Sequence, residues 1–353
     1  MRPLPLRETL LDWYARHGRR LPWRETRDPY HIWVSEIILQ QTRIAQGTDY
    51  YLRFVERFPD IASLAAASED QVLKQWQGLG YYSRARNLHR AAQLLAEQFD
   101  GQFPRSYHQV RSLPGIGDYT AAAICSIAYR MPYAVLDGNV YRVLSRYFDL
   151  DTPIDTTAGK KLFTRLANEQ LDQDRPGDYN QAIMDFGALQ CTPSLPECPR
   201  CPLRPHCRAQ AAGTVALRPA KSKRSEPSPR YLHYFHIVSP EGTWVRRRTE
   251  DDIWRGLYEF PRIETPDDLP AEQMLSDVRY KALIRSAATA KVLETLPPVK
   301  HLLSHRVLHI RFYRVSIPTP GFSLEGYAPA TKEDLAHFAF PRPLAAYLER
   351  SAR

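Results

Sequence analysis

The sequence contains no apolar run long enough to cross a membrane. Its longest apolar runs fall far short of the roughly 20 residues that a membrane helix needs. The N-terminal segment also lacks the apolar core of a secretory signal, because it is interrupted by Arg7, Glu8, Asp12 and Arg16. These absences argue against a membrane or secreted protein and make a reducing cytoplasm, in a nucleoid or nuclear setting, the expected location.

Cysteine is scarce as well, because the 353 residues include five, and four of these lie between positions 191 and 207. In a reducing compartment such crowding favours a metal site over disulfides. Cys191, Cys198, Cys201 and Cys207 form a C-x6-C-x2-C-x5-C pattern, whereas zinc usually takes four thiolates from two C-x2-C pairs. The spacing therefore predicts a metal centre without fixing the metal. The fifth, Cys125, is expected to be a buried structural thiol.

Acidic residues are outnumbered, with 39 Asp and Glu against 48 Lys and Arg. The net charge of +9 and the isoelectric point near 9.3 favour a polyanionic partner, and nucleic acid is the leading candidate. A hydrophobic content of 43% describes an ordinary globular protein. The length allows two domains, each with its own core.

No strand-rich stretch precedes residue 213, so the first domain, residues 1–212, is expected to be all helical. Helical patterns cover residues 4–18, 31–46, 64–67, 69–78, 83–98, 107–113, 140–147 and 156–190, and another begins near Asp118. A linker rich in Pro, Ser and basic residues follows at 213–230; it suits a path along a phosphate backbone, or only a tether. The second domain, residues 231–353, is predicted to be α+β, with strands at 231–238, 243–248, 292–296 and 308–317 and helices at 271–287 and 342–350.

Residues 113–117, reading LPGIG, form a turn in which two glycines flank one apolar residue, directly before the helical pattern at Asp118. Gly115 and Gly117 permit positive φ and leave backbone N–H groups uncovered. A helix N-terminus after such a turn suits a phosphate oxygen. The region near 107–130 therefore predicts an anchor for a phosphate backbone, which carries no sequence readout.

Two carboxylates are candidates for chemistry. Glu36 lies among apolar residues in IWVSEIILQQT, where desolvation would raise its pKa and let it donate a proton near neutrality. The alternatives are a salt bridge to Arg43 or Arg84, or simple exposure. Asp137 follows an apolar run and precedes the helix expected at 140–147, so it either caps that helix or presents a negative charge at a cleft. The two roles can coexist.

Several polar and aromatic side chains in two loops are suited to base edges, base faces or phosphates. They are Gln40, Gln41, Thr42, Tyr81, Tyr82 and Arg84. The first three also fit a solvated turn of helix. At least one of the two tyrosines, in a turn framed by two glycines, is expected to belong to the core.

The glycine turn and the aspartate together resemble the helix-hairpin-helix DNA glycosylase superfamily. Over nearly all of residues 10–210, the chain more narrowly resembles its A/G-mismatch adenine DNA glycosylase family, through VSEIILQQT, GLGYYSRARNL, LPGIGDYTAAAI, LDGNVYRVL, NQAIMDFGALQC and the cysteine loop. This resemblance implies a monofunctional enzyme that excises adenine mispaired with 8-oxoguanine or guanine in double-stranded DNA. It also implies a [4Fe-4S] cluster on the loop 191–207. We expect the enzyme to be a monomer.

The resemblance also implies roles for individual residues. Glu36 takes the position of the acid that protonates adenine N7, and Asp137 that of the carboxylate that stabilises the oxocarbenium-like sugar. Tyr119 and Asn139 take the positions of supporting active-site residues. Gln41 and Tyr81 take the positions of residues that fill the gap left by the flipped adenine or flank the oxidised guanine. A related glycosylase and lyase family has a nucleophilic lysine where Tyr119 stands. Because tyrosine cannot form a Schiff base, strand cleavage is expected to be weak or absent.

The second domain resembles a nudix-like domain through WRGLYEFP at 254–261. A working nudix hydrolase needs a Glu-rich helix that begins with Arg-Glu, and no Arg-Glu pair occurs after residue 25, so we expect no such hydrolysis. The resemblance instead implies recognition of the oxidised guanine by a loop with Ser304 and His305. Many family members have phenylalanine before that serine, and here the residue is Leu303.

Two rival interpretations remain open at this stage. The first is a glycosylase of the same fold that acts on mismatched thymine or uracil or on oxidised pyrimidines. The second is a non-catalytic DNA-binding protein with an iron-sulfur cluster, in which Glu36 and Asp137 would be a surface residue and a helix cap. A base-release assay separates all three.

Overall fold

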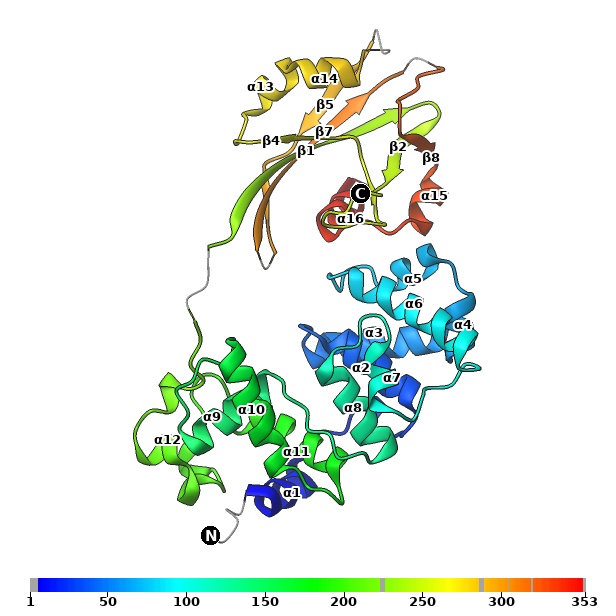
Figure 1. Ribbon diagram of the computed structural model, residues 1–353. Helices are drawn as coiled ribbons and strands as arrows, with labels where there is room; N and C mark the ends of the chain where they lie inside the picture. The colour runs from blue at the N-terminus through cyan, green and yellow to red at the C-terminus, as the bar shows by residue number, and fades with distance from the viewer. Residues whose placement is uncertain (1–5, 223–225, 286–288, 304, 319, 352–353) are drawn as a thin grey trace. The chain divides into compact units, whose positions relative to one another are not determined.

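The computed structural model describes residues 6–222, 226–285, 289–303, 305–318 and 320–351 (Figure 1). The chain forms two compact units. The first contains Met1–Ala66 and Asn87–Arg224, and the second contains Ala67–Arg86 and Ser225–Arg353. Within the described ranges, none of the helices has the length and apolar character needed to span a bilayer.

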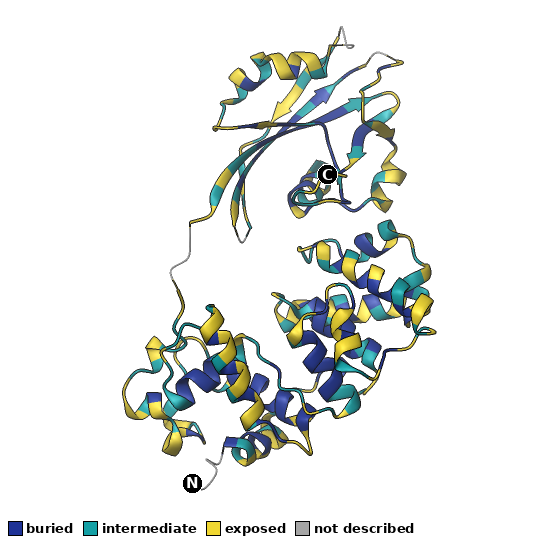
Figure 2. Ribbon diagram, viewed as in Figure 1, coloured by how far each residue is buried: buried dark blue, intermediate teal, exposed yellow. Residues whose placement is uncertain are grey.

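The first unit is helical throughout its described residues, as the sequence predicts (Figure 1). Its α-helices are α1 (Leu6–His17), α2 (Pro29–Leu39), α3 (Ile44–Arg57), α4 (Ile61–Ala66), most of α6 (Ser83–Gln98), α7 (Tyr107–Ser112), α8 (Asp118–Tyr129), α9 (Gly138–Phe148), α10 (Thr157–Gln170), α11 (Pro176–Leu189) and α12 (Arg208–Ala211). Short 3-10 turns lie at η1 (Pro22–Arg24), η2 (Cys198–Arg200), η3 (Arg204–His206) and η4 (Val215–Leu217). Buried side chains of α1, α8, α9, α10 and α11 form one shared core (Figure 2).

Two helices that the sequence pattern suggests as continuous are each split, so both predictions are wrong in this respect. The pattern at 31–46 breaks after α2, because Gln41 takes a left-handed conformation with φ 59° before α3 begins. The pattern at 156–190 divides into α10 and α11, and Pro176 stands in the first turn of α11. Proline favours a helix start and opposes a helix interior.

The second unit is built on an eight-stranded mixed sheet (Figure 1). Its strands are β1 (Ser228–Ser239), β2 (Gly242–Arg247), β3 (Tyr258–Glu259), β4 (Arg262–Thr265), β5 (Lys291–Thr295), β6 (Val299–Leu302), β7 (Arg306–Ser316) and β8 (Ala328–Ala330). The main order is β3-β2-β1-β7-β5, with β1 and β7 parallel in a register that pairs Leu232 with Ile310. The sequence predicts β1, β2, β5 and β7, whereas β3, β4, β6 and β8 are too short to show alternation.

Helices cover both faces of this sheet. Along β1 and β7, alternate side chains point to opposite faces, so Leu232 and Tyr234 pack with α16 (Arg342–Ser351), and Phe235 and Ile237 pack toward α13 (Ala271–Ser276) and α14 (Val278–Leu283). The middle of β1, residues 232–237, is buried on both faces, although it includes His233 and His236 among the apolar residues (Figure 2). The α+β prediction for this part of the chain is confirmed.

The second unit also includes α5 (Glu69–Gln75), the turn after it and the first residues of α6. The sequence prediction assigns these residues to the helical domain. In the structure, α5 packs beside α15 (Lys332–His337), and Lys74 Nζ donates to the carbonyl oxygen of Phe338 at 2.9 Å.

The basic linker is partly fixed rather than a plain tether. Arg218 pairs with Asp149 of the first unit at 2.9 Å, and Ser222 bonds to Asp155. Arg230, at the start of the sheet, forms ion pairs with Asp252 and Glu264. These partners neutralise two of the arginines that the sequence offers to a phosphate backbone.

Candidate active site

Glu36 is a buried carboxyl group near the end of α2. Asp28 caps the helix by accepting from Tyr30 N at 2.8 Å, and Pro29 fills its first position. The remainder of the helix is almost wholly buried, including Trp33 and Ile38 at 0% exposed, and Glu36 itself is 9% exposed. The alternative of an exposed Glu36 is therefore excluded.

The environment of Glu36 favours its protonated form. Burial raises the pKa of this carboxyl from 4.5 to about 7, a hydrogen bond with Tyr119 opposes that rise, and the negative charge of Asp137 adds to it. Arg24 acts in the opposite direction, through its positive charge. The charged side chains that shift the pKa of Glu36 are thus Asp137 and Arg24. Arg43 and Arg84, which the sequence offers as salt-bridge partners of Glu36, are not among them. A carboxyl with this pKa can hold a proton near neutrality.

Asp137 is the N-cap of α9. Its Oδ1 accepts from Asn139 N at 2.9 Å and from Val140 N at 2.8 Å, and its Oδ2 accepts from Asn139 Nδ2 at 2.7 Å. Burial raises the pKa of Asp137, and these hydrogen bonds act against that rise because they favour the charged form. Asp137 also lines a cavity together with Glu36, so the capping role and the cleft position coexist.

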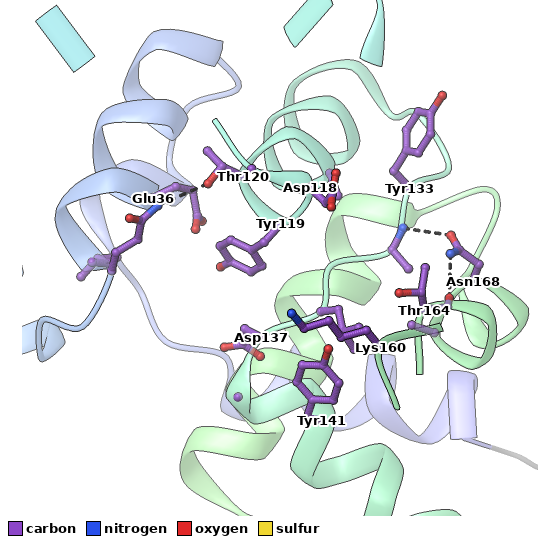
Figure 3. Close-up of a pocket in the computed structure, with 18 of the residues that line it drawn as sticks. Glu36, Asp118, Tyr119, Thr120, Tyr133, Asp137, Tyr141, Lys160, Thr164 and Asn168 are labelled. Atoms are coloured by element: carbon purple, nitrogen blue, oxygen red, sulfur yellow. Dashed lines mark hydrogen bonds between the residues drawn. The ribbon is translucent and has the colours of Figure 1, made fainter. Parts of the chain in front are cut away.

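Tyr119 projects from the first turn of α8 between the two carboxylates (Figure 3). Its hydroxyl donates to Met184 Sδ at 3.3 Å and is hydrogen-bonded to Glu36. Burial, with the nearby charges of Glu36 and Asp137, raises its pKa well above 10. Tyr119 therefore stays neutral, and its hydroxyl can donate to the Glu36 carboxylate, which is why this hydrogen bond lowers the pKa of Glu36.

Two cavities meet at the two carboxylates. The larger, of about 890 Å³, extends from Glu36 and Asp137 past the glycine turn (Figure 3). The other, of about 650 Å³, shares Glu36, Tyr119 and Asp137 with the first cavity. Its further walls come from Leu21, Trp23, Arg24, Ile44, Asn139, Gln181 and Met184. The two carboxylates thus line both cavities, and we call the second cavity, which Trp23 and Arg24 also line, the inner pocket.

The glycine turn forms a tight hairpin between α7 and α8. Leu113 and Ile116 are buried, and Ile116 N donates to Leu113 O at 3.1 Å. Gly115 has φ +75°, and a Cβ there would lie 2.7 Å from Cβ of Asn87. Gly117 has no such neighbour and is the N-cap of α8 without a side-chain cap bond, and Gly117, Asp118, Tyr119 and Thr120 line the larger cavity.

The other candidate DNA contacts differ in their surroundings. Gln40 and Gln41 line the larger cavity, and Thr42 lines the inner pocket. Tyr81 is 48% exposed and Tyr82 is 5% exposed, so Tyr81 is the more accessible of the two, and a DNA contact of Tyr82 stays a prediction. The expectation that one tyrosine belongs to the core is confirmed.

Arg84 and the β6–β7 turn complete this set. The Arg84 guanidinium lies over the Trp76 ring and donates to the carbonyl oxygens of Leu79 and Gly80, so it supports the turn that carries Tyr81. In the β6–β7 turn, Leu303 N donates to Arg306 O at 2.9 Å and His305 is exposed. Ser304 lies outside the described residues.

Several site residues escape the sequence reasoning. Arg24 forms an ion pair at 2.7 Å with Asp185, which is 0% exposed and also pairs with Arg19. Trp23 precedes Arg24 in η1, where neither has a periodic pattern to mark it. Lys160 of α10 lines the larger cavity near Asp137 (Figure 3). A Trp-Arg pair after a helix does not by itself indicate an active-site residue. The ion-pair partner of Arg24 lies about 160 positions away in the chain, so the local sequence does not reveal it.

The cysteine loop is tied to α9 by two buried arginines. Arg142 Nε donates to Cys191 O at 2.7 Å, and Arg142 Nη2 donates to Asn139 Oδ1 at 2.8 Å. Arg146 Nη1 donates to Thr192 O at 2.7 Å and lies 3.4 Å from Cys191 Sγ. The four loop cysteines are free thiols, and Cys125 is a buried thiol in α8 as expected.

A hairpin beside two buried carboxylates in a helical unit defines a base excision DNA repair protein. The HhH-GPD superfamily of base excision DNA repair proteins matches residues 34–169, and the NUDIX domain family matches residues 233–350. The chain is 35% identical to the adenine DNA glycosylase of Buchnera aphidicola subsp. Baizongia pistaciae, over 88% of this chain and 86% of that protein. It is 32% identical to the Homo sapiens adenine DNA glycosylase, over 92% of this chain and 68% of that protein. The chain belongs to the adenine DNA glycosylase family.

Solved structures agree on the fold of the helical unit. A thermostable thymine-DNA glycosylase is 29% identical with a TM-score of 0.54, covering 58% of this chain and 94% of its own. A trapped endonuclease III–DNA covalent intermediate is 21% identical with a TM-score of 0.51, over the same shares of the two chains, and shows a shared fold.

Proposed function

We propose that this chain hydrolyses the N-glycosidic bond of adenine mispaired with 8-oxoguanine or guanine in double-stranded DNA. The observation that carries the proposal is Glu36, a buried carboxyl whose pKa is raised to about 7, beside Asp137 in one cavity next to the hairpin. Burial holds the proton on Glu36, and the hydrogen bonds to Asp137 favour its charged form, so the two carboxyl groups suit an acid and a stabiliser of positive charge. This pairing supports an enzyme over a non-catalytic DNA-binding protein.

The inner pocket suits a purine that has been flipped out of the duplex. Trp23 and Leu21 offer flat and apolar surface for the ring, while Arg24 and Gln181 offer polar groups to its edge. Glu36 stands at the entrance and would protonate N7, which turns the base into a better leaving group. The proton leaves Glu36 as the bond between the base nitrogen and C1′ breaks.

Asp137 would stabilise the positive charge that develops on the sugar. Three N–H donors from Asn139 and Val140 hold its two oxygens in place, so the carboxylate does not need to reorganise during the reaction. Water then adds to C1′ and passes its extra proton to the Glu36 carboxylate, which regenerates the acid and leaves an abasic site. Tyr119 offers no amine for a Schiff base, which supports hydrolysis without strand cleavage.

The phosphate backbone would be held by the hairpin and by a cation of the larger cavity. The first turn of α8 presents N–H groups beyond Gly117, and helix N-termini of this kind favour phosphate oxygens. Lys160 adds a positive charge to the same cavity. Gln41 and Tyr81 are the candidates for the gap that the flipped nucleotide leaves.

We propose that Cys191, Cys198, Cys201 and Cys207 hold a [4Fe-4S] cluster. The thiols are free and close enough to influence one another electrostatically. Yet within the described ranges, no three His, Cys, Asp or Glu side chains gather tightly enough for a single metal ion. The support for the cluster is the C-x6-C-x2-C-x5-C spacing together with the similarity of this loop to those of iron-sulfur glycosylases, because zinc usually takes its four thiolates from two C-x2-C pairs. When bound, the cluster would fix the loop that Arg142 and Arg146 tie to α9.

The second unit would read the base opposite adenine. The β6–β7 turn carries Leu303 and the exposed His305, with Ser304 between them, and we propose that this loop recognises 8-oxoguanine. We further propose that the protein acts as a monomer in the cytoplasm, associated with the nucleoid. The domain limits 1–212, 213–230 and 231–353 stay a prediction.

The experiment that tests the proposal compares substrates under single-turnover conditions. Labelled duplexes carry A opposite 8-oxoguanine, A opposite G, T opposite G, U opposite G, or an oxidised pyrimidine, and each reaction is divided into halves with and without alkali. We expect alkali-dependent breaks at adenine in the first two duplexes alone. Breaks at thymine, uracil or the oxidised pyrimidine would favour a different glycosylase of this fold, and breaks without alkali would contradict the monofunctional assignment.

A further inference from the structure

The turn that carries Tyr81 has an unusual backbone. Gly78, Gly80 and Tyr81 have φ of 98°, 73° and 47°, so three of four consecutive residues are left-handed. A tyrosine rarely adopts this region, and such a conformation persists only where the surroundings hold it. We name residues 78–81 the Tyr81 turn. Its exposed ring is the part of the second unit that we propose meets DNA bases.

Bonds within the α5–α6 segment hold one side of the Tyr81 turn. Trp76 Nε1 donates to Gly80 O at 3.1 Å, and Arg84 Nη2 donates to the same oxygen at 3.2 Å. The Arg84 guanidinium lies 5.5 Å from the Tyr81 ring centroid. A cation at this distance over an aromatic face restrains the ring.

The C-terminal part of the chain holds the other side. The buried Tyr82 hydroxyl accepts from Gly78 N at 3.2 Å and donates to Phe340 O at 3.3 Å. Gln77 Oε1 accepts from Phe340 N at 3.4 Å. Gly78 of the Tyr81 turn is therefore linked to the backbone of Phe340 through the Tyr82 hydroxyl, and the preceding residue, Gln77, is bonded to the same backbone directly. The segment 338–340 is itself fixed, because Tyr258 stacks on Phe338 at 3.9 Å.

Charged contacts fasten α5 to the sheet. Arg247 at the end of β2 pairs with Glu69 at 2.7 Å and with Asp70 at 3.1 Å, and Lys74 Nζ donates to Phe338 O. Gly256 has φ +82°, and a Cβ there would lie 3.2 Å from Glu69 and 3.3 Å from Leu73. This close approach shows that α5 sits directly on the loop before β3.

We propose that Arg247, Lys74 and the backbone of residues 338–340 are positioning elements that hold the Tyr81 turn in the geometry needed to unstack DNA. The sheet-bearing part of the chain would then contribute to base extrusion as well as to recognition of the opposite base. The inference rests on the proposed function in one respect, the contact of Tyr81 with bases. It predicts that excision of adenine opposite guanine, where no oxidised base is present, also depends on these contacts.

The test uses the full chain and a duplex with 2-aminopurine next to the A·G mispair, because this base brightens when its neighbours unstack. Arg247→Met should lower the fluorescence gain and the single-turnover excision rate about three- to tenfold, and Arg247→Lys should restore most of both. The control is Arg255→Met, an exposed arginine of the same unit that pairs with Asp251. It should behave as wild type.

A double-mutant cycle separates positioning from a general structural role. If Arg247 acts through the turn, Arg247→Met should have no further effect in a Tyr81→Ala background, whereas a multiplied loss would overturn the proposal. A second variant, Lys74→Met, should give the same pattern and guards against a failure of one variant to fold. Suppose that Arg247→Met and Lys74→Met both keep the wild-type fluorescence gain and excision rate, while Glu36→Gln still abolishes excision. That result would overturn this inference and leave the proposed function standing. Wild-type excision by Glu36→Gln would instead overturn the proposed function.

Discussion

Glu36→Gln should abolish excision and stabilise the fold at the same time. Glutamine keeps the shape of the side chain but has no proton to give at N7. General acid catalysis contributes about 10²- to 10⁴-fold. The single-turnover rate of adenine release should therefore fall by at least about 100-fold, while affinity for the mismatch duplex stays close to that of wild type.

The stability effect follows from the raised pKa. Below pH 4.5 the folded and unfolded forms both carry the proton, and Glu36 lowers the free energy of unfolding only slightly. Between 4.5 and about 7 the folded protein keeps a proton that the unfolded chain releases, so the free energy of unfolding falls as the pH rises. Above pH 7 the full cost of about 3 kcal/mol applies, at roughly 1.36 kcal/mol per pKa unit. Glutamine removes this cost because it carries no charge.

The assay is thermal unfolding of wild type and Glu36→Gln at pH 5 and pH 8. We expect the variant to gain roughly 6 to 12 °C at pH 8 and much less at pH 5, because 1 kcal/mol shifts Tm by about 2 to 4 °C for a unit of this size. Glu56→Gln, at an exposed position of α3, is the matched control and should change neither Tm nor rate. A variant that is less stable than wild type at pH 8, or that keeps its rate, would refute the reasoning.

Three further predictions follow from the site and the loops. Tyr119→Phe removes a hydrogen bond that lowers the pKa of Glu36, so the alkaline limb of the pH–rate profile, measured in single turnovers, should move to higher pH; a shift to lower pH would contradict this. Gly115→Ala should lower Tm and duplex affinity, since φ is +75° and a Cβ would clash, whereas Gly117→Ala should leave Tm unchanged. Equal losses of Tm in the two variants would contradict this difference between Gly115 and Gly117. Ser304→Ala should weaken the preference for 8-oxoguanine over guanine and spare excision opposite guanine, as judged by relative rates; equal loss on both would indicate a structural loop.

Local signals in the sequence predict the parts of the fold that depend on neighbours in the chain. The helix after the glycine turn and the cap at Asp137 follow from residue types with known backbone preferences. The break after α2 does not, because the apolar pattern continues through it while Gln41 turns left-handed. Glutamine has no known preference for the left-handed region, so the residue type does not predict this conformation.

Contacts between distant parts of the chain determine the features of the site that the local sequence pattern does not predict. Glu36 is buried by α8 and faces Asp137, about 100 positions away, so its pKa depends on packing that periodicity does not encode. Arg24 enters the site because Asp185 of α11 holds it. The same limit applies to the residues around Tyr81, because the local pattern places them in the helical domain although their partners lie near Phe340.

The central claim is that Glu36 and Asp137 together release adenine, and the most direct measurement is free base counted by mass spectrometry. Wild type, Glu36→Gln and Asp137→Asn are each incubated in excess with a duplex that carries A opposite 8-oxoguanine. We predict one free adenine per duplex from wild type and essentially none from either variant over the same time, although all three bind the duplex. Adenine released by either variant at the wild-type rate, or a different base released by wild type, would contradict it.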